Sequence, residues 1–286
     1  MTHNGPMSKF CSKCSRKGPM RMKLHMKRIV AGLLAALTLI VPAGCSADSS
    51  AIGGLLDGLA SQGQSQSYGS LPKEWSLAAA PDYYTVVGKA DFSGVDLPKA
   101  GEIRYAEPDA LGRSGQVVGV IDKALRTEGS ERERDMPSTI TGWPKKNPEV
   151  DINLTADNTC SLAKDSRPKN TCYHGYLFNK SHLIAKSLGG QDIAKNMVTG
   201  TRTQNVGKNN PAGGMAYTES EARDWIDKHP DGTITYMATP NYTGDELLPR
   251  TVTVDIRTSD GSIDQRVVVW NAANGFTIDY AKGGTR

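Results

Sequence analysis

The segment from Tyr176 to Asn205 constrains the fold of this chain more than any other. It begins with an apolar, aromatic run, carries one histidine, His182, and then reaches a Gly-Gly turn at Gly189 and Gly190. A polar stretch rich in Asn, Thr and Arg follows and ends at Asn205. An apolar run bounded by glycine is typical of a strand, so we expect a strand that presents His182 near its end.

Short segments rich in β-branched residues recur along the chain, separated by turn residues. We expect strands at Gln116–Ile121, Val150–Leu154, Tyr173–Phe178, Thr233–Thr239, Thr251–Arg257 and Arg266–Trp270. Strands therefore dominate, and the pattern predicts a single α+β domain with a mainly antiparallel sheet and helices between the strands.

One amphipathic helix is expected at Ser220–Lys228. Its apolar face would carry Ala222, Trp225 and Ile226. Thr218 and Glu221 have the spacing of a capping box, which predicts that the helix begins there. The charged stretch at residues 126–136 is expected to be exposed.

The first 45 residues predict export. Met26-Lys27-Arg28 is a basic start, residues 29–41 form an apolar run, and small residues then lead to Cys45. This order is typical of a secretory signal peptide, and a cysteine after Ala-Gly resembles the lipid-attachment motif of bacterial lipoproteins, although Pro42 replaces the usual leucine. We expect an exported protein, either secreted or held at the membrane by a lipid on Cys45. Residues 46–74 are interpreted as a flexible tether and residues 75–286 as the folded domain.

The net charge of +4 comes from the leader. Eight of the 34 Lys and Arg residues lie in residues 1–45, which hold no acid, so the remainder has 26 basic and 30 acidic residues, a net of −4. Residues 160–210 differ, because they hold eight basic residues against two acidic ones, a local charge of +6. Binding of phosphate groups needs local charge of this kind, although a solvated basic face has the same composition.

The remaining cysteines after Cys45 are Cys160 and Cys172. Cysteine pairs in exported proteins are usually oxidised, so we expect a disulfide between them. The bond would close a short loop, stabilise the fold by about 3 kcal/mol and hold the segment that leads to His182.

His182 and Asn205 are candidates for chemistry by residue type. A histidine is the side chain best suited to transfer protons near neutral pH, and an amide carbonyl is a hard oxygen ligand for Mg²⁺. Together they indicate metal-assisted attack of water on a phosphodiester. A structural histidine and a turn residue before Gly207 are the alternatives. His174 and His229 are interpreted as a surface strand residue and a helix-end residue.

Several short motifs surround His182 and Asn205 in the sequence. They are Phe178-Asn179-Lys180-Ser181-His182-Leu183-Ile184-Ala185, Leu188-Gly189-Gly190, Val198-Thr199-Gly200-Thr201-Arg202-Thr203-Gln204-Asn205-Val206, and Gly214-Met215 with Glu219. Shorter matches flank them in order, so the resemblance covers about residues 83–282. In this register the chain resembles the DNA/RNA non-specific endonucleases, above all secreted streptococcal deoxyribonucleases and DNA-entry nucleases.

The resemblance implies a ββα-metal fold, also called the His-Me finger, in which a strand presents the histidine and a later helical segment the metal ligand. It implies that His182 is the general base that takes a proton from water. Asn205 would be the direct protein ligand of one Mg²⁺ ion, with Mn²⁺ as the alternative metal. Glu219 would orient water on that ion, unless it only favours the positive end of its helix.

Further candidates lie around these residues. Asn179-Lys180-Ser181-His182 stands where many members of the family carry Asp-Arg-Gly-His. We expect Asn179 and Lys180 to contact substrate, with Lys180 in place of the arginine. Arg202 would share a helix face with Asn205 and clamp a phosphate, or form a structural salt bridge. Asn196 is a competing ligand candidate and a further substrate contact.

The function expected from this resemblance is an extracellular, Mg²⁺-dependent endonuclease that cuts DNA, with RNA as a further candidate substrate. Contacts to phosphate and sugar carry no sequence information, so little sequence preference is expected. No protein partner is indicated. The alternatives are a non-catalytic nucleic-acid-binding lipoprotein on the same fold and an antibacterial toxin nuclease, which the signal and tether disfavour.

Overall fold

The computed structural model describes residues 74–208 and 211–286. The predicted signal peptide, Cys45 and all of the predicted tether except Glu74 lie outside these residues. Within the described part of the chain, no helix has the length and apolar character needed to cross a membrane.

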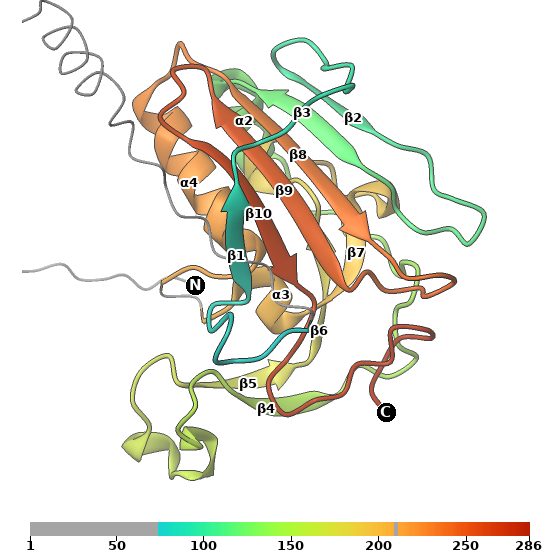
Figure 1. Cartoon of the computed structure of the whole chain (residues 1–286), viewed down its shortest axis with the longest axis vertical. Helices are drawn as coiled ribbons and strands as arrows, with labels where there is room; N and C mark the ends of the chain where they lie inside the picture. Colours follow the sequence, from blue (N-terminus) through green and yellow to red (C-terminus); the bar gives the residue numbers. More distant parts are fainter. Residues whose placement is uncertain (1–73, 209–210) are drawn as a thin grey trace, which may run out of the picture. The chain divides into compact units, whose positions relative to one another are not determined.

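A six-stranded antiparallel sheet forms the largest layer of the fold (Figure 1). Its strands, in spatial order, are β1 (Tyr84–Gly88), β10 (Asp264–Trp270), β9 (Thr251–Thr258), β8 (Ile234–Asn241), β3 (Val117–Ile121) and β2 (Glu102–Tyr105). The register of the sheet places four residues side by side across neighbouring strands: Val117, Ala238, Val254 and Val267. All four are fully buried. This row lies on the core face of the sheet, because side chains alternate between faces along each strand. The α+β class with a mainly antiparallel sheet is confirmed, and the two edge strands are the ones that the sequence did not predict.

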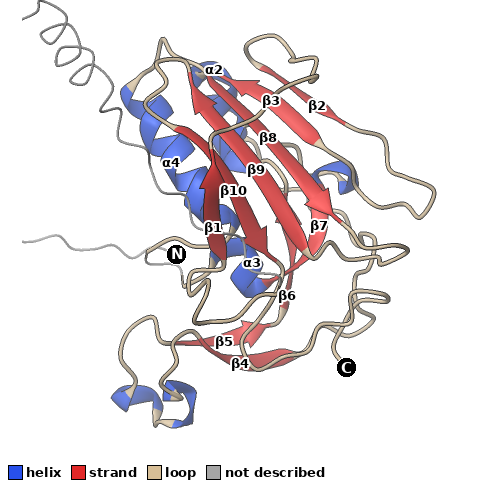
Figure 2. Ribbon diagram, viewed as in Figure 1, coloured by secondary structure: helices blue, strands red, loops and turns tan. Residues whose placement is uncertain are grey.

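Two helices pack against the core face of this sheet, α2 (Lys123–Glu131) and α4 (Met215–Lys228) (Figure 2). The predicted apolar face of α4 is buried, with Ala222, Trp225 and Ile226 in the main core. Asp122 is the N-cap of α2, and its carboxylate accepts a hydrogen bond from the Leu125 backbone N–H at 2.8 Å. Part of the stretch expected to be exposed and charged is therefore helical.

The start of α4 differs from the prediction. The helix begins at Met215, directly after Gly214, rather than at Ser220. Thr218 lies inside the helix, where its hydroxyl contacts the Met215 carbonyl at 3.2 Å and the Tyr236 hydroxyl at 2.8 Å. The predicted Thr218–Glu221 capping box is therefore wrong, because Thr218 is a buried core residue and not an N-cap.

Two small antiparallel sheets lie beside the main layer. Strand β4 (Glu149–Asn153) pairs with β5 (Cys172–Tyr176), and β6 (Phe178–His182) pairs with β7 (Met197–Thr201), which leads directly into α3 (Arg202–Val206). The single strand predicted at Tyr173–Phe178 is two strands. The break falls at Leu177, whose N–H donates to Pro148 O and whose carbonyl accepts from Arg202 N.

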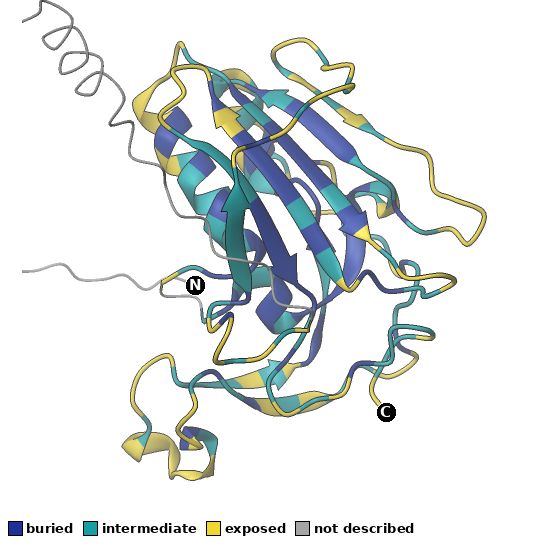
Figure 3. Cartoon of the chain, in the orientation of Figure 1, coloured by how far each residue is buried: buried dark blue, intermediate teal, exposed yellow. Residues whose placement is uncertain are grey.

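Among the described residues, the loops carry four short 3-10 helices: η1 (Thr159–Ser161), η2 (Lys164–Ser166), η3 (Lys186–Leu188) and η4 (Ala194–Asn196). The predicted Cys160–Cys172 disulfide is present and ties the η1 loop to the start of β5. A second cluster of buried residues, which includes Ile152, Leu177 and Phe178, joins the β4–β5 hairpin to β6. Most of β4 and β5 is exposed or half-buried, whereas the middle strands of the main sheet are largely buried (Figure 3). The hairpin beside β6 is therefore fixed by a small core and by a covalent bond.

Candidate active site

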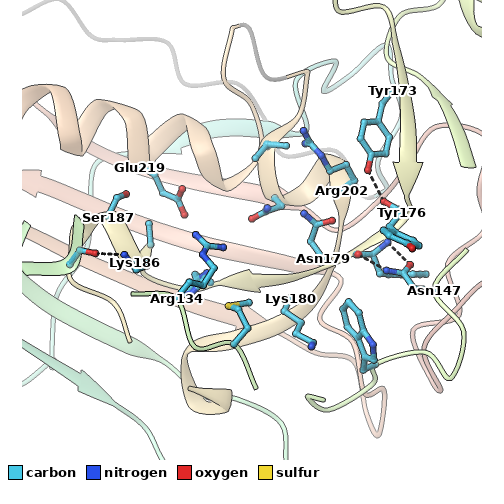
Figure 4. Close-up of a pocket in the computed structure, with 18 of the residues that line it drawn as sticks. Arg134, Asn147, Tyr173, Tyr176, Asn179, Lys180, Lys186, Ser187, Arg202 and Glu219 are labelled. Atoms are coloured by element: carbon cyan, nitrogen blue, oxygen red, sulfur yellow. Dashed lines mark hydrogen bonds between the residues drawn. The ribbon is translucent and has the colours of Figure 1, made fainter. Parts of the chain in front are cut away.

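A cleft of about 960 Å³ is bordered by β5, β6, α3, α4 and the segment that follows α2. Six of the seven predicted catalytic, metal-binding and substrate-binding residues line it: Asn179, Lys180, His182, Arg202, Asn205 and Glu219. In Figure 4, Arg134 and Asn179 lie in the middle of this cleft, Arg202 lies beside Tyr173, and Glu219 lies toward the other end. The folded chain therefore collects residues that are up to 40 positions apart in sequence around one cavity.

The β6–β7–α3 unit is the ββα arrangement that the sequence predicts. His182 ends β6 opposite Met197 of β7, and its side chain is 11% exposed. Its Nε2 lies 2.6 Å from Oδ1 of Asp192. No other described residue forms a hydrogen bond with the imidazole, so Nδ1 is the nitrogen left to accept a proton.

Asp192 reaches His182 because of the Gly-Gly turn. Gly189 has a φ of +97°, and a Cβ on Gly190 would lie 1.9 Å from the Ile184 carbonyl oxygen, so glycine is required at both positions. The turn sends the chain back along β6 and places Asp192 beside the histidine. The sequence prediction missed this residue, although an acid directly beyond a glycine turn was the available signal.

The pKa values of this pair suit a neutral base beside an ionised carboxylate. Burial lowers the pKa of His182 below its ordinary value, and the hydrogen bond and charge of Asp192 only partly oppose this. Burial would raise the pKa of Asp192, but hydrogen bonds from His182 and from the Asp135 N–H hold it below its ordinary value. The imidazole is therefore unprotonated near neutral pH, and the carboxylate can stabilise the imidazolium that forms when it takes a proton.

Asn205 projects into the cleft from α3. Thr201 is the N-cap of this helix, and its hydroxyl accepts a hydrogen bond from the Gln204 N–H at 3.0 Å. The buried Ser181 hydroxyl lies 3.1 Å from Asn205 Oδ1, which fixes the amide and leaves its second lone pair available to a cation. The turn interpretation of Asn205 is wrong, because the residue is helical.

Glu219 enters the cleft from α4 with a side chain that is 13% exposed. Its nearest cation is Arg223, with an N–O distance of 3.8 Å, and no described residue donates a hydrogen bond to its carboxylate. Burial raises the pKa of Glu219 to about 7, and Arg223 only partly opposes this. A cation beside the carboxylate would favour its charged form, so this position suits a metal ion or its water shell.

Within residues 74–208 and 211–286, no cluster of three or more His, Cys, Asp and Glu side chains could hold a metal. An ion in this cleft would therefore rely on few protein ligands. One amide oxygen and one nearby carboxylate fit Mg²⁺, which keeps several waters and binds through few protein ligands together with substrate phosphates.

Four cationic residues line the cleft: Arg134, Lys180, Lys186 and Arg202. Arg202 packs over the Tyr173 ring, with 4.8 Å from the guanidinium carbon to the ring centre. The Lys180 ammonium donates to the carbonyls of Pro137 and Ser138 at 2.7 and 2.9 Å, so it braces the segment next to Arg134. Arg134 is exposed and points into the middle of the cleft in Figure 4. The sequence prediction missed Arg134, because it treated this stretch as an ordinary charged surface.

Asn196 does not join the site. It is fully buried and does not line the cleft. Its Oδ1 accepts from the Ile184 N–H at 3.0 Å, and its Nδ2 donates to the carbonyls of Ile184 and Gln191 at 2.9 Å each. The amide is occupied by the loop that carries Asp192, so the prediction that Asn196 binds metal or substrate is corrected to a structural role.

The other two histidines outside the leader have local explanations. His174 is exposed on β5 and pairs with Asp151 at 2.9 Å. His229 follows α4, where its ring bonds to the Trp225 carbonyl at 2.8 Å and stacks on the Trp225 indole. Neither residue lines the cleft.

Comparison with known proteins agrees with this geometry. A family model described as DNA/RNA non-specific endonuclease matches residues 146–260. A deoxyribonuclease from Streptococcus dysgalactiae subsp. equisimilis is 32% identical over 238 residues, which cover 71% of this chain and 72% of that protein. This chain belongs to the DNA/RNA non-specific endonuclease family. The predicted family and the predicted nuclease activity are thereby confirmed, and the non-catalytic alternative is set aside.

Solved structures of nucleases share the fold. The structure of Sda1 nuclease with a bound zinc ion is 33% identical, with a TM-score of 0.66, and the match covers 74% of this chain and 99% of that chain. The structure of NucA from Streptococcus agalactiae with a bound magnesium ion is 22% identical, with a TM-score of 0.51 over 69% of this chain and 83% of that one. The predicted ββα-metal fold is confirmed. The match to NucA, at 22% identity, supports the fold alone.

Proposed function

We propose that this nuclease is an exported, divalent-metal-dependent endonuclease that hydrolyses the phosphodiester bonds of DNA with little sequence preference. One observation carries the proposal: His182 and Asn205, from the two ends of one ββα unit, line the same cleft as Glu219 of α4. A base, a neutral oxygen ligand and a buried carboxylate are the parts that hydrolysis of a phosphodiester beside a hydrated cation requires.

His182 is the proposed general base. Its Nδ1 takes the proton of the attacking water, while Nε2 holds the hydrogen bond to Asp192. Asp192 keeps the ring in one orientation and stabilises the charge that the ring acquires. A positioned base of this kind contributes about 10²- to 10⁴-fold to the rate.

Asn205 and Glu219 are the proposed holders of the metal, with Asn205 as the direct ligand and Glu219 beside its water shell. Mg²⁺ is the expected ion, and Mn²⁺ is the alternative. When bound, it would neutralise charge on the phosphate and assist departure of the leaving oxygen. Arg134 and Arg202 are proposed to contact phosphate oxygens, and Asn179 and Lys180 to line the path of the strand.

Export is part of the proposal. It rests on the predicted signal peptide and on the Cys160–Cys172 disulfide, a bond typical of oxidising compartments. The deoxyribonuclease of Streptococcus dysgalactiae supports DNA as the substrate. A lipid on Cys45 would hold the enzyme at the cell surface, and release without a lipid would make it a secreted enzyme.

The test is plasmid cleavage with Mg²⁺, with Mn²⁺ and with EDTA, by the wild-type chain and the His182→Ala variant. His174→Ala is the matched control, because it removes an exposed histidine that lies outside the cleft. We expect cleavage that needs the metal, is lost in His182→Ala and persists in His174→Ala. Undiminished cutting by His182→Ala would remove the proposed mechanism, and RNA assayed in parallel would define sugar selectivity.

A further inference from the structure

One end of the active-site cleft is built from aromatic rings. Figure 4 shows Tyr173 and Tyr176 together with Asn147 at this end, whereas Glu219 lies at the opposite end. Trp143 lines the same cavity. The 960 Å³ volume lies near the top of the range of about 300–1,000 Å³ for pockets that bury drug-sized ligands, so the cleft can accept more than a phosphate group.

Tyr176 is unusual in its exposure. Among the residues that the structure describes, four large apolar or aromatic side chains are exposed, and Tyr176 is the one aromatic residue, at 55%. Within the same part of the chain, its side chain has no hydrogen bond, ring contact or cation contact. An exposed ring inside a catalytic cleft has a face available to a ligand.

The backbone of β5 is shaped to bring two tyrosines to this end. Residues three apart on a regular strand point to opposite faces, yet Tyr173 and Tyr176 both line the cleft. Gly175 has a φ of +149°, and the Tyr173 hydroxyl donates to the Tyr176 carbonyl at 3.0 Å. A Cβ on Gly175 would lie 2.5 Å from that hydroxyl oxygen, so glycine permits both rings to face the cavity.

Cations alternate with these rings. Arg202 lies over Tyr173, and the Lys180 ammonium lies 4.9 Å from the centre of a Trp143 ring. Grooves that hold single-stranded nucleic acid combine cations for the backbone with aromatic rings for the bases. The Asn147 amide is held in place by the backbone of Phe178, because its oxygen accepts from the Phe178 N–H and its nitrogen donates to the Phe178 carbonyl. The rings and the cations are therefore the groups at this end that suit a base and its phosphate.

We propose that Tyr176, supported by Tyr173 and Trp143, stacks against an unpaired base of the DNA strand being cut, close to the scissile linkage. This inference rests on the proposed nuclease function and adds a preference to it. Both faces of a base inside a duplex are covered by neighbouring base pairs, so the ring can be used only where a base is unstacked. The enzyme therefore favours single-stranded or locally unpaired DNA over intact duplex.

The test is a double-mutant cycle with the full-length chain and a labelled single strand that has one cleavable linkage among phosphorothioates. Abasic sites are placed in turn at each position within three nucleotides of that linkage. The variants are Tyr176→Ala, Tyr176→Phe, which keeps the ring, and Leu162→Ala, a control that truncates an exposed apolar side chain outside the cleft. Cleavage of the same strand is also measured in a perfect duplex and in a duplex with one unpaired bulge. Comparison of the three substrates shows whether the enzyme needs a free single strand or only one base outside the stack.

We expect an abasic site at one position to lower kcat/KM of the wild-type enzyme by about fivefold or more, as loss of one stacked base would. On the intact strand, kcat/KM of Tyr176→Ala should be lower than that of the wild type by a similar factor, and the abasic site should not lower it further. Tyr176→Phe and Leu162→Ala should behave as wild type. Equal losses on single strand and duplex, or additive effects at every position, would overturn the inference.

A binding measurement separates this inference from the proposed function. With EDTA present, a 2-aminopurine base at the same position should be quenched by the wild-type chain and not by Tyr176→Ala. Quenching without cleavage in Mg²⁺ would refute the proposed function and retain the stacking site. Cleavage with equal quenching by both proteins would refute the stacking site and retain the function.

Discussion

Replacement of Asp192 by asparagine tests the chemistry of the cleft most directly. The substitution keeps the size of the side chain and removes its charge. The pair is 2.6 Å apart, with side chains 11% and 6% exposed, so solvent screens it little. For charge centres about 4 Å apart and an effective dielectric constant of about 20, the attraction between imidazolium and carboxylate is about 4 kcal/mol.

This attraction develops as the proton moves from water to His182. If half of the charge has formed in the transition state, the loss is about 2 kcal/mol, and if all has formed it is about 4 kcal/mol. At 1.36 kcal/mol per tenfold, Asp192→Asn should lower kcat by about 30- to 1,000-fold. Asp151→Asn is the matched control, because it alters the exposed His174–Asp151 pair, and it should keep wild-type activity.

The pH dependence of kcat/KM is a second test of the Asp192→Asn variant. A general base is active when unprotonated, so kcat/KM should fall as the pH drops through the pKa of His182, which burial holds below its ordinary value of about 6.5. Asp192 raises that pKa, so its neutralisation should move the acidic limb to lower pH while the plateau falls. Plasmid-nicking rates between pH 4.5 and 8 measure both effects. A kcat within threefold of wild type, or an acidic limb that moves upward, would refute this account of the pair.

Three further predictions concern the metal and the fold. Asn205→Ala should lower activity by about 10²-fold or more at fixed Mg²⁺, with partial recovery at high Mg²⁺, since it removes the one proposed direct ligand; recovery is read from a metal titration. Glu219→Gln should raise the Mg²⁺ concentration for half-maximal activity by about 10- to 100-fold, and an unchanged titration curve would exclude Glu219 from the metal site. Replacement of Cys160 and Cys172 by serine opens a loop with a sequence separation of 12. The double variant should lose about 3 kcal/mol and about 6–12 °C in Tm by calorimetry, whereas an unchanged Tm would show that the hairpin core alone holds this segment.

The sequence predicted the elements whose signal is local. Strands β3, β8, β9 and β10 were predicted from their β-branched patterns, and the apolar face of α4 from its helical spacing. The edge strands β1 and β2 were not predicted, because half-exposed edge strands carry a weak apolar signal. The start of α4 was misplaced because Thr218 bonds to Tyr236, a contact that depends on the folded sheet and not on helix capping.

The site residues also divide into those that a local motif predicts and those whose role depends on contacts between distant segments. His182 and Asn205 belong to one ββα unit, whose parts are close in sequence, so a motif finds them. Asp192 and Arg134 were missed, because their roles depend on how the Gly-Gly turn and the segment after α2 fold around β6. Asn196 was chosen by residue type alone, and its complete set of backbone bonds is visible only in three dimensions.

The departures from the usual Asp-Arg-Gly-His motif are consistent with one another in the structure. Ser181 takes the glycine position, and its hydroxyl fixes the amide of Asn205. Lys180 takes the arginine position but bonds to the carbonyls of Pro137 and Ser138, close to Arg134. Arg134 therefore brings a guanidinium to the middle of the cleft from another segment, and Lys180 braces that segment. His182, the Asn205 amide and this guanidinium line the same cavity.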